Sequence, residues 1–409
     1  MTPLCTLVAA TLLAAQPPLP LSPPADRTPG APPAKVPAPK QQRPLADKEV
    51  EPGAPPAKVP VPKPPAFRAA GADATVGEMR LEQKQVARLV IEMAMFKLQG
   101  GHFTDADLRT TIADIQRCAD IEKSLAQLDG ERVEVVLTQL LSLTELESYF
   151  QARAAMGIVG ADTYLDVRFH RLGARASLLE EVKADPAVIR RHREGQVAAG
   201  KSRDEEFAKR RAGGQFTANE AFFGPERTNS EASSAASHAA TPAERDAVNR
   251  KAVESLKENE KYFTQRIASG IARESTLHLV TYLRLDAELR EVSAAENPPA
   301  DRVRQLREQR RDAIRRAVEL EAGRRDQGLF GQGDTDQLRT AQRYLIKAEL
   351  ALAADAEARR VLLARNLEEA VSYEKRCEGE AKAGIASESR QYRSTRERIE
   401  AEIRLKLAK

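Results

Sequence analysis

The sequence predicts an all-α protein of six helical-hairpin repeats, grouped as three pairs of about 113 residues and preceded by a disordered Pro-rich segment. Three observations indicate this fold class: an internal repeat, a glycine at an equivalent place in each unit, and apolar residues spaced by three and four. We see no alternating pattern of the kind that indicates a β-strand. The hairpins are expected to pack as an elongated bundle or solenoid with coiled-coil character.

The repeat is clearest between residues 145–158 and residues 258–271, which lie 113 residues apart. Eight of these fourteen positions are identical, including a Tyr-Phe pair and a final Gly-Ile. A weaker copy follows, because residues 270–272 and residues 384–386 are both Gly-Ile-Ala at an offset of 114. A repeated unit of this kind buries its apolar face against its neighbours, so the repeat predicts architecture and not chemistry.

One glycine in each unit marks the turn of a predicted hairpin. Glycine adopts the left-handed conformation at low cost and commonly closes a helix. Thr104 and Thr217 each precede an acidic residue by three positions, which is the spacing of a capping box at a helix start. Thr241 has the same spacing and is followed by a proline. The predicted turn and cap residues are Gly101, Gly157, Gly214, Gly270, Gly331, Gly384, Thr104, Thr217 and Thr241.

Apolar residues follow the helical period within the units. One such stripe consists of Leu338, Ala341, Leu345, Ala348 and Leu352. A second stripe runs through residues 303–320 and is interrupted by Arg310. The chain is rich in Ala and Leu and contains no Trp, so its helices can approach closely and pack as antiparallel pairs.

The repeat and the composition together divide the chain into five parts. The predicted parts are a signal peptide at 1–15, a disordered Pro-rich spacer at 16–70, and hairpin pairs at 71–184, 185–296 and 297–409. Within the second pair, a Gly-Pro step and low hydrophobicity predict a mobile loop over residues 224–240.

The first part contains an apolar run of twelve residues, from Leu4 to Ala15. A membrane-spanning helix needs about 20 residues, so the run is typical of a secretory signal. We therefore expect export to the periplasm or cell envelope.

The second part holds 18 of the 24 prolines and repeats residues 29–37 as residues 52–60. Proline at this density removes amide donors and fixes the backbone, which predicts an extended spacer. This part also carries eight Lys or Arg against four acidic residues, which accounts for the whole net charge of +4. We expect weak contact of the basic spacer with anionic polymer or lipid, and no nucleic-acid partner for the balanced body.

No pattern predicts a catalytic, cofactor or metal site. The five histidines are scattered, and none has a second histidine or a cysteine three or four residues away. Cys118 and Cys377 lack metal-ligand spacing and are expected to be buried thiols. Four glutamates recur in the repeats beside basic residues and are expected to form surface ion pairs: Glu147, Glu260, Glu321 and Glu374.

Two further segments each allow two interpretations. The glycine-rich residues 328–333 fit a phosphate cradle or a helix cap, and their place at a hairpin turn favours the cap. Residues 302–316 contain seven arginines, which fit a docking site for an acidic partner or a helix with cationic outer faces. We favour the second interpretation for this segment.

The last unit carries a resemblance to a known family. Its small-residue turn at residues 383–387, followed by Tyr392 and by residues 399–405, resembles the helical hairpin of TolC-type outer-membrane efflux proteins. The resemblance covers residues 251–409 best and residues 75–184 faintly. It implies a TolC-like component of efflux or transport, although TolC-type proteins also contain membrane-spanning strands and the sequence shows no strand segment.

The sequence therefore predicts a non-enzymatic, exported helical-repeat scaffold that binds protein partners in the cell envelope. Self-association is one of the interactions left open. The alternative is a TolC-like transport component.

Overall fold

All regular secondary structure in the described part of the computed structural model is α-helical, which confirms the predicted all-α class. The structure describes residues 74–408 apart from residues 101, 102, 104, 213–217, 238, 240, 296, 330, 331, 385 and 386. The described residues belong to one compact unit, Arg68–Lys409. The predicted signal peptide at 1–15 and spacer at 16–70 lie outside the described residues.

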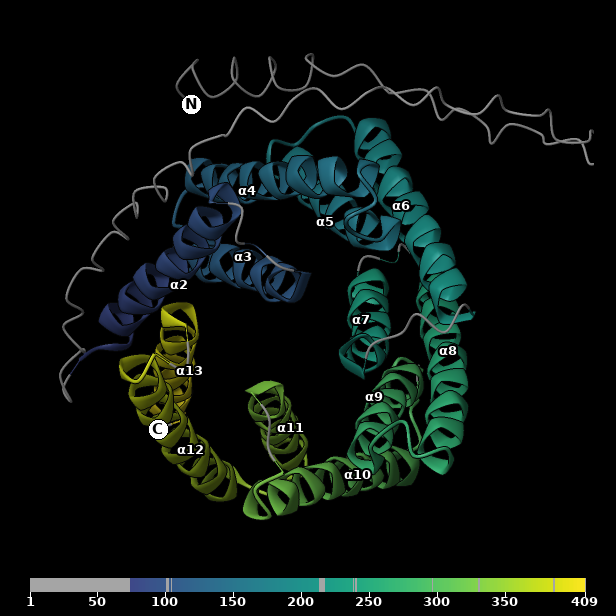
Figure 1. Cartoon of the computed structure of the whole chain (residues 1–409), viewed down its shortest axis with the longest axis vertical. Helices are drawn as coiled ribbons and strands as arrows, with labels where there is room; N and C mark the ends of the chain where they lie inside the picture. Colours follow the sequence, from purple (N-terminus) through teal and green to yellow (C-terminus); the bar gives the residue numbers. More distant parts are fainter. Residues whose placement is uncertain are drawn as a thin grey trace, which may run out of the picture. The chain divides into compact units, whose positions relative to one another are not determined.

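Helices of two lengths alternate along the described chain (Figure 1). The longer ones are α2 (Val76–Gln99), α4 (Asp129–Ala155), α6 (Pro186–Ala212), α8 (Pro242–Ala268), α10 (Ala300–Asp326) and α12 (Ala356–Lys382). The shorter ones are α3 (Asp105–Leu125), α5 (Ala161–Glu181), α7 (Ala218–Ser237), α9 (Glu274–Ser293), α11 (Gln332–Leu350) and α13 (Glu388–Leu407). The former have 24 to 27 residues and the latter 19 to 21.

The last described helix packs against the first. Figure 1 shows α13 beside α2, and their side chains and those of α3 form polar contacts. Arg393 and Arg396 of α13 donate to the carboxylate of Asp114 in α3 at 2.6 and 2.8 Å. Lys406 donates to the carbonyl oxygen of Ala74 at 2.6 Å. Residues more than 270 positions apart in the sequence are therefore joined in the fold.

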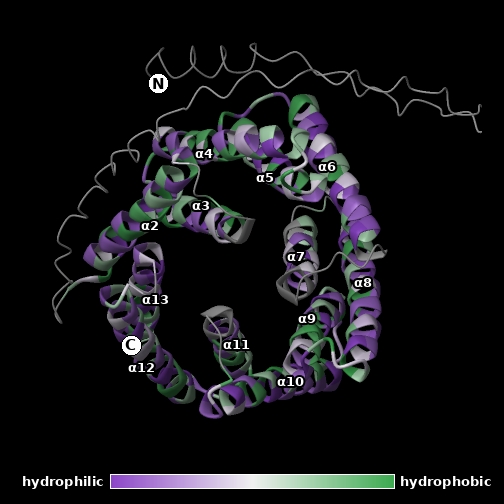
Figure 2. Ribbon diagram, in the orientation of Figure 1, coloured by the Kyte–Doolittle hydropathy of each residue, from purple (hydrophilic) through white to green (hydrophobic). Residues whose placement is uncertain are grey.

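The apolar core has two main clusters of buried side chains. One is formed by α2, α3, α4 and α5 and contains Leu143, Leu146 and Phe150, all fully buried. The other is formed by α7 to α11 and contains the predicted stripe residues Ala341 and Ala348. Helices in both regions show hydrophobic and hydrophilic residues along the same ribbon (Figure 2), as expected of helices with one buried face.

Left-handed glycines end several of the longer helices. Gly157, Gly270 and Gly384 have φ angles of 69°, 69° and 71°. After α8, the Gly270 amide donates to the carbonyl of Ile267, and the next amide, that of Ile271, donates to the carbonyl of Arg266. This pair of bonds is a Schellman motif, which satisfies carbonyls that the helix end leaves free.

The other predicted turn residues have mixed outcomes. Thr241 caps α8: its hydroxyl accepts from the Glu244 amide at 3.1 Å, and the Glu244 carboxylate accepts from the Thr241 amide. At the end of α10 the left-handed residue is Gly328, with φ of 71°, so the glycine-rich segment contains a helix cap there. The remaining predicted residues, Gly101, Gly214, Gly331, Thr104 and Thr217, lie outside the described residues.

The predicted mobile loop at 224–240 is wrong over most of its length, because α7 continues to Ser237 with Pro225 inside the helix. Contacts with other helices explain the difference. Ala232 packs in the core cluster of α7 to α11, and the side chains of Asn229 and Glu231 bond to arginines of other helices. Local composition favoured a loop, and these long-range contacts outweigh it.

Candidate functional site

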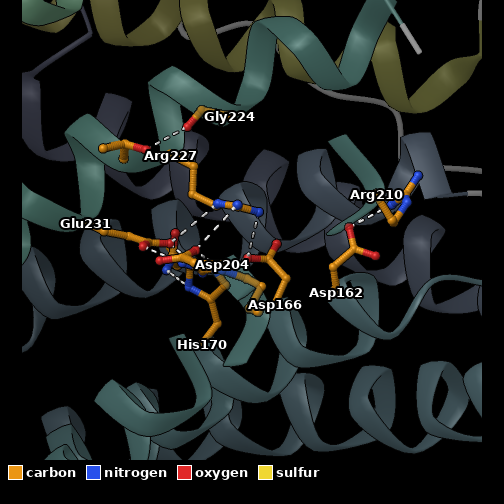
Figure 3. A network of polar contacts seen from close by, with 11 residues as sticks. Asp162, Asp166, His170, Asp204, Arg210, Gly224, Arg227 and Glu231 are labelled. Atoms are coloured by element: carbon orange, nitrogen blue, oxygen red, sulfur yellow. Dashed lines mark hydrogen bonds and ion pairs between the residues drawn. The ribbon is translucent and has the colours of Figure 1, made fainter. Parts of the chain in front are cut away.

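A polar network joins α5, α6 and α7 (Figure 3). α5 places Asp162, Asp166 and His170 on one face, because residues four apart in a helix lie one above the other. α6 contributes Arg203, Asp204 and Arg210. α7 contributes Arg227 and Glu231, which are also four residues apart. Helical periodicity thus directs charged groups from three helices toward one place.

Arg203 of α6 lies at the centre of the network and is only 1% exposed. Its two terminal nitrogens donate to both carboxylate oxygens of Glu231, at 2.5 and 2.6 Å. They also donate to Asp166 and to Asp204, each at 3.0 Å. The guanidinium carbon lies 4.9 Å from the centre of the Phe169 ring. This geometry is bidentate toward one carboxylate and shares the remaining donors between two more.

A second arginine, Arg227, offsets part of the remaining negative charge. Arg227 lies between 3.7 and 4.0 Å from Asp166, Asp204 and Glu231, and its guanidinium stacks over the ring of Phe207 at 4.9 Å. Three carboxylates therefore surround two guanidinium groups.

The pKa shifts reflect this crowding of charge. Burial lowers the pKa of Arg203, but the hydrogen bonds and charge of Glu231 outweigh burial, and the net shift is upward. For Arg227, burial and then the neighbouring charge of Arg203 lower the pKa. Arg203 is thus the cation that the carboxylates hold most firmly.

His170 lies beside this network. Burial lowers its pKa, which favours the neutral imidazole. Its Nδ1 lies 3.0 Å from the side-chain amide nitrogen of Gln116 in α3. Because an amide nitrogen can only donate, Nδ1 is the acceptor in this contact. The imidazole therefore takes part in a contact between α5 and α3.

Separately, Arg210 at the end of α6 donates to Asp162 at 2.7 Å, as Figure 3 also shows. Each carboxylate in the figure is already engaged by a guanidinium group. This arrangement ties three helices together, because removing Arg203 or Asp166 would leave a buried charge with reduced solvation.

Similar networks occur elsewhere in the fold. Arg310, which interrupts the predicted apolar stripe of α10, is 4% exposed and pairs with Asp286 of α9. Arg290 donates to the same aspartate at 2.7 Å and to the side-chain oxygen of Asn229 in α7 at 2.6 Å. Arg339 of α11 donates to Glu397 of α13 at 3.0 Å. Buried arginines therefore recur at contacts between different helices.

Three of the four recurring glutamates form one repeated contact. Glu147, Glu260 and Glu374 each accept from the arginine 24 residues later, on the next shorter helix. The distance from the arginine Nε is 2.8 Å at Glu260 and 2.7 Å at Glu374. The partners are Arg171, Arg284 and Arg398.

The expectation of surface ion pairs is wrong for these glutamates. Their side chains are only 11%, 21% and 21% exposed, because each lies between two packed helices. Glu321 differs, since its side chain is fully buried and accepts from the hydroxyl of Ser275.

The arginine-rich segment 302–316 is largely paired. Arg304 binds Glu308, and Arg315 binds Glu349 of α11 at 3.3 Å. These partners agree with the favoured interpretation of a helix with cationic faces relieved by acidic neighbours.

The predicted turn and cap residues that the structure describes lie at helix ends and take no part in the networks above: Gly157, Gly270, Gly384 and Thr241. Cys118 and Cys377 are buried and free, as expected. Within the described ranges, no group of three His, Cys, Asp or Glu side chains is arranged to hold a metal ion. Nor does any helix among those residues have an apolar stretch that could span a membrane.

Comparison of the chain with protein-family models, curated proteins and solved structures finds no match. The resemblance to TolC-type hairpins stays a prediction.

Proposed function

We propose that the protein is a non-enzymatic scaffold made of six helical hairpins, each a longer helix followed by a shorter one. The observation that carries this proposal is the Glu–Arg contact that recurs in register within three hairpins, at Glu147, Glu260 and Glu374. The same contact at offsets of 113 and 114 residues is what repeated copies of one unit would retain. The repeat read from the sequence and the side-chain contact thus point to the same units.

The use of the charged groups supports a binding role over a catalytic one. The best-buried ionisable side chains, such as Arg203 and Arg310, join helices of neighbouring hairpins. Surfaces built from stacked repeats are commonly used to bind other proteins, since their exposed residues can change without loss of the core. Large apolar side chains stand exposed on this surface, including Ile271 and Val361 at 60% each.

We propose that this scaffold is exported and binds protein partners in the cell envelope. Export rests on the apolar run at 4–15 and on the Pro-rich segment that follows it, both of which lie outside the described residues. A spacer of that composition would hold the helical part at a distance from its attachment point.

The test is site-specific photocrosslinking of the full chain in living cells of the source organism. A photoreactive residue at Ile271 or Val361 is expected to give an adduct with a defined envelope protein, or with a second copy of the chain. The same residue at Ala341, which is fully buried, is the matched control and is expected to give none.

Two results would contradict the proposal. Adducts found solely with cytosolic proteins, or none from any exposed position, would refute an envelope scaffold. A ring-shaped oligomer extracted from the outer membrane would instead favour the TolC-like transport component.

A further inference from the structure

A hollow of about 150 Å³ lies between the end of α10, the middle of α11 and the C-terminal half of α12. We call it the α10–α12 hollow. Three arginines line it, Arg325, Arg339 and Arg376, and Glu369 is the one acidic residue of its lining. Its volume is roughly that of five water molecules in the liquid, which is enough for a small oxyanion and part of an attached group.

The inner arginine is held in a fixed position. Arg339 is 6% exposed, donates to Glu397 at 3.0 Å and stacks over the ring of Tyr373 at 5.4 Å. Its planar guanidinium is therefore ordered before any ligand arrives, which lowers the entropic cost of binding.

Other donors that line the hollow are not used by the protein itself. The side chains of Gln342, Ser372 and Arg376 form no hydrogen bond or ion pair with the residues that the structure describes. Arg325 pairs with its exposed neighbour Asp326 at 3.1 Å. This pair joins adjacent residues and does not hold two helices together. Amide, hydroxyl and guanidinium donors together are the set that recognises phosphate oxygens.

The lining holds more basic than acidic side chains, since three guanidinium groups lie in it with one carboxylate. Two of them also have carboxylate partners outside the hollow, because Arg339 pairs with Glu397 and Arg325 pairs with Asp326. Arg376 keeps its charge for a ligand. Burial raises the pKa of Glu369, and its Oε2 is buried without a hydrogen bond.

We propose that the α10–α12 hollow binds a phosphate group, either as inorganic phosphate or as the phosphate of a small monoester. Arg339 forms the fixed inner contact, and Arg325 and Arg376 close on the phosphate oxygens from the exposed side. This site is independent of the proposed scaffold role, which does not require a small ligand.

The experiment is isothermal titration calorimetry of the full chain with sodium phosphate, and separately with glycerol 1-phosphate, against sodium chloride of equal ionic strength. We expect saturable binding of the phosphates and none of chloride. Tighter binding of glycerol 1-phosphate identifies a monoester as the ligand class, and equal binding identifies the free anion.

Arg325→Gln and Arg376→Gln are each expected to weaken phosphate binding about tenfold or more, because each removes a charged donor. Arg360→Gln is the matched control, since Arg360 is an exposed arginine of the same helix α12 and does not line the hollow. Binding no stronger than that of chloride would overturn the proposal. An equal loss in Arg360→Gln would also overturn it, and circular dichroism of each variant checks that the fold is retained.

Discussion

Two glycines five residues apart at the end of α12 should respond in opposite directions to the same substitution. Gly379 is helical, whereas Gly384 follows the helix with φ of 71°. A Cβ built on either glycine meets no heavy atom within 4 Å, so steric contact contributes to neither substitution. Only the backbone preference differs between the two positions.

Gly379→Ala should raise the free energy of unfolding by up to about 1 kcal/mol, because alanine is the better helix former and restricts the unfolded chain. Gly384→Ala should lower it by about 1 kcal/mol, since an L side chain is strained in the left-handed region. The expected separation of the two variants is therefore about 2 kcal/mol.

Urea unfolding followed by far-ultraviolet circular dichroism measures this separation as a difference in midpoint at an unchanged slope. Gly323 and Gly328 form a second pair with the same spacing and the same free space, at the end of α10. Midpoints that move in the same direction within both pairs would refute the assignment of Gly384 and Gly328 as left-handed caps.

Three more outcomes follow from the structure and sequence. Arg203→Met should lower the free energy of unfolding by about 3–5 kcal/mol, because its carboxylate partners lose a buried cation. Arg304→Met, at an exposed ion pair, should lower it by less than about 1 kcal/mol. Similar urea midpoints of the two variants would contradict this expectation. Burial raises the pKa of Glu226 despite a hydrogen bond from Tyr344 and the charge of Arg343. Its contribution to stability is therefore complete below the ordinary glutamate pKa of about 4.3 and is lost as the pH rises through the higher folded value. Glu226→Gln should flatten that loss in thermal midpoints measured against pH, and parallel profiles would argue against a buried, protonated Glu226. Deleting residues 52–60, one copy of the proline-rich repeat, should leave thermal unfolding of the helical part unchanged, since so few apolar side chains bury little surface; a lowered midpoint would show that the segment packs on the helices.

The local features of the fold were predictable from the sequence. The helices, the left-handed turn at Gly270 and the cap at Thr241 depend on residues within a few positions of one another, which is the range that sequence patterns report. Arg310 was visible as an interruption of an apolar stripe, and its burial beside Asp286 follows from that position.

The features that depend on distant partners were not predictable. α7 has the composition of a loop. Its helix is stabilised by a contact of Glu231 with an arginine 28 residues away and by a contact of Asn229 with an arginine 61 residues away. The recurring glutamates were assigned to the surface because charged residues are mostly exposed. Their partners lie 24 residues along the chain, beyond the three- or four-residue spacing that a helix face reveals.

The contact of α13 with α2 and α3 has a consequence for how the chain reaches its folded state. A linear array of repeats can grow from one end, and its terminal units need polar caps to be soluble. Here the surfaces of α2 and α3 that receive α13 stay uncovered until α13 has been synthesised, because Asp114 finds its two arginine partners 279 and 282 residues later. Loss of α13 would therefore expose the facing surfaces of α2 and α3, and a ribosome-bound chain cannot complete this contact before α13 emerges.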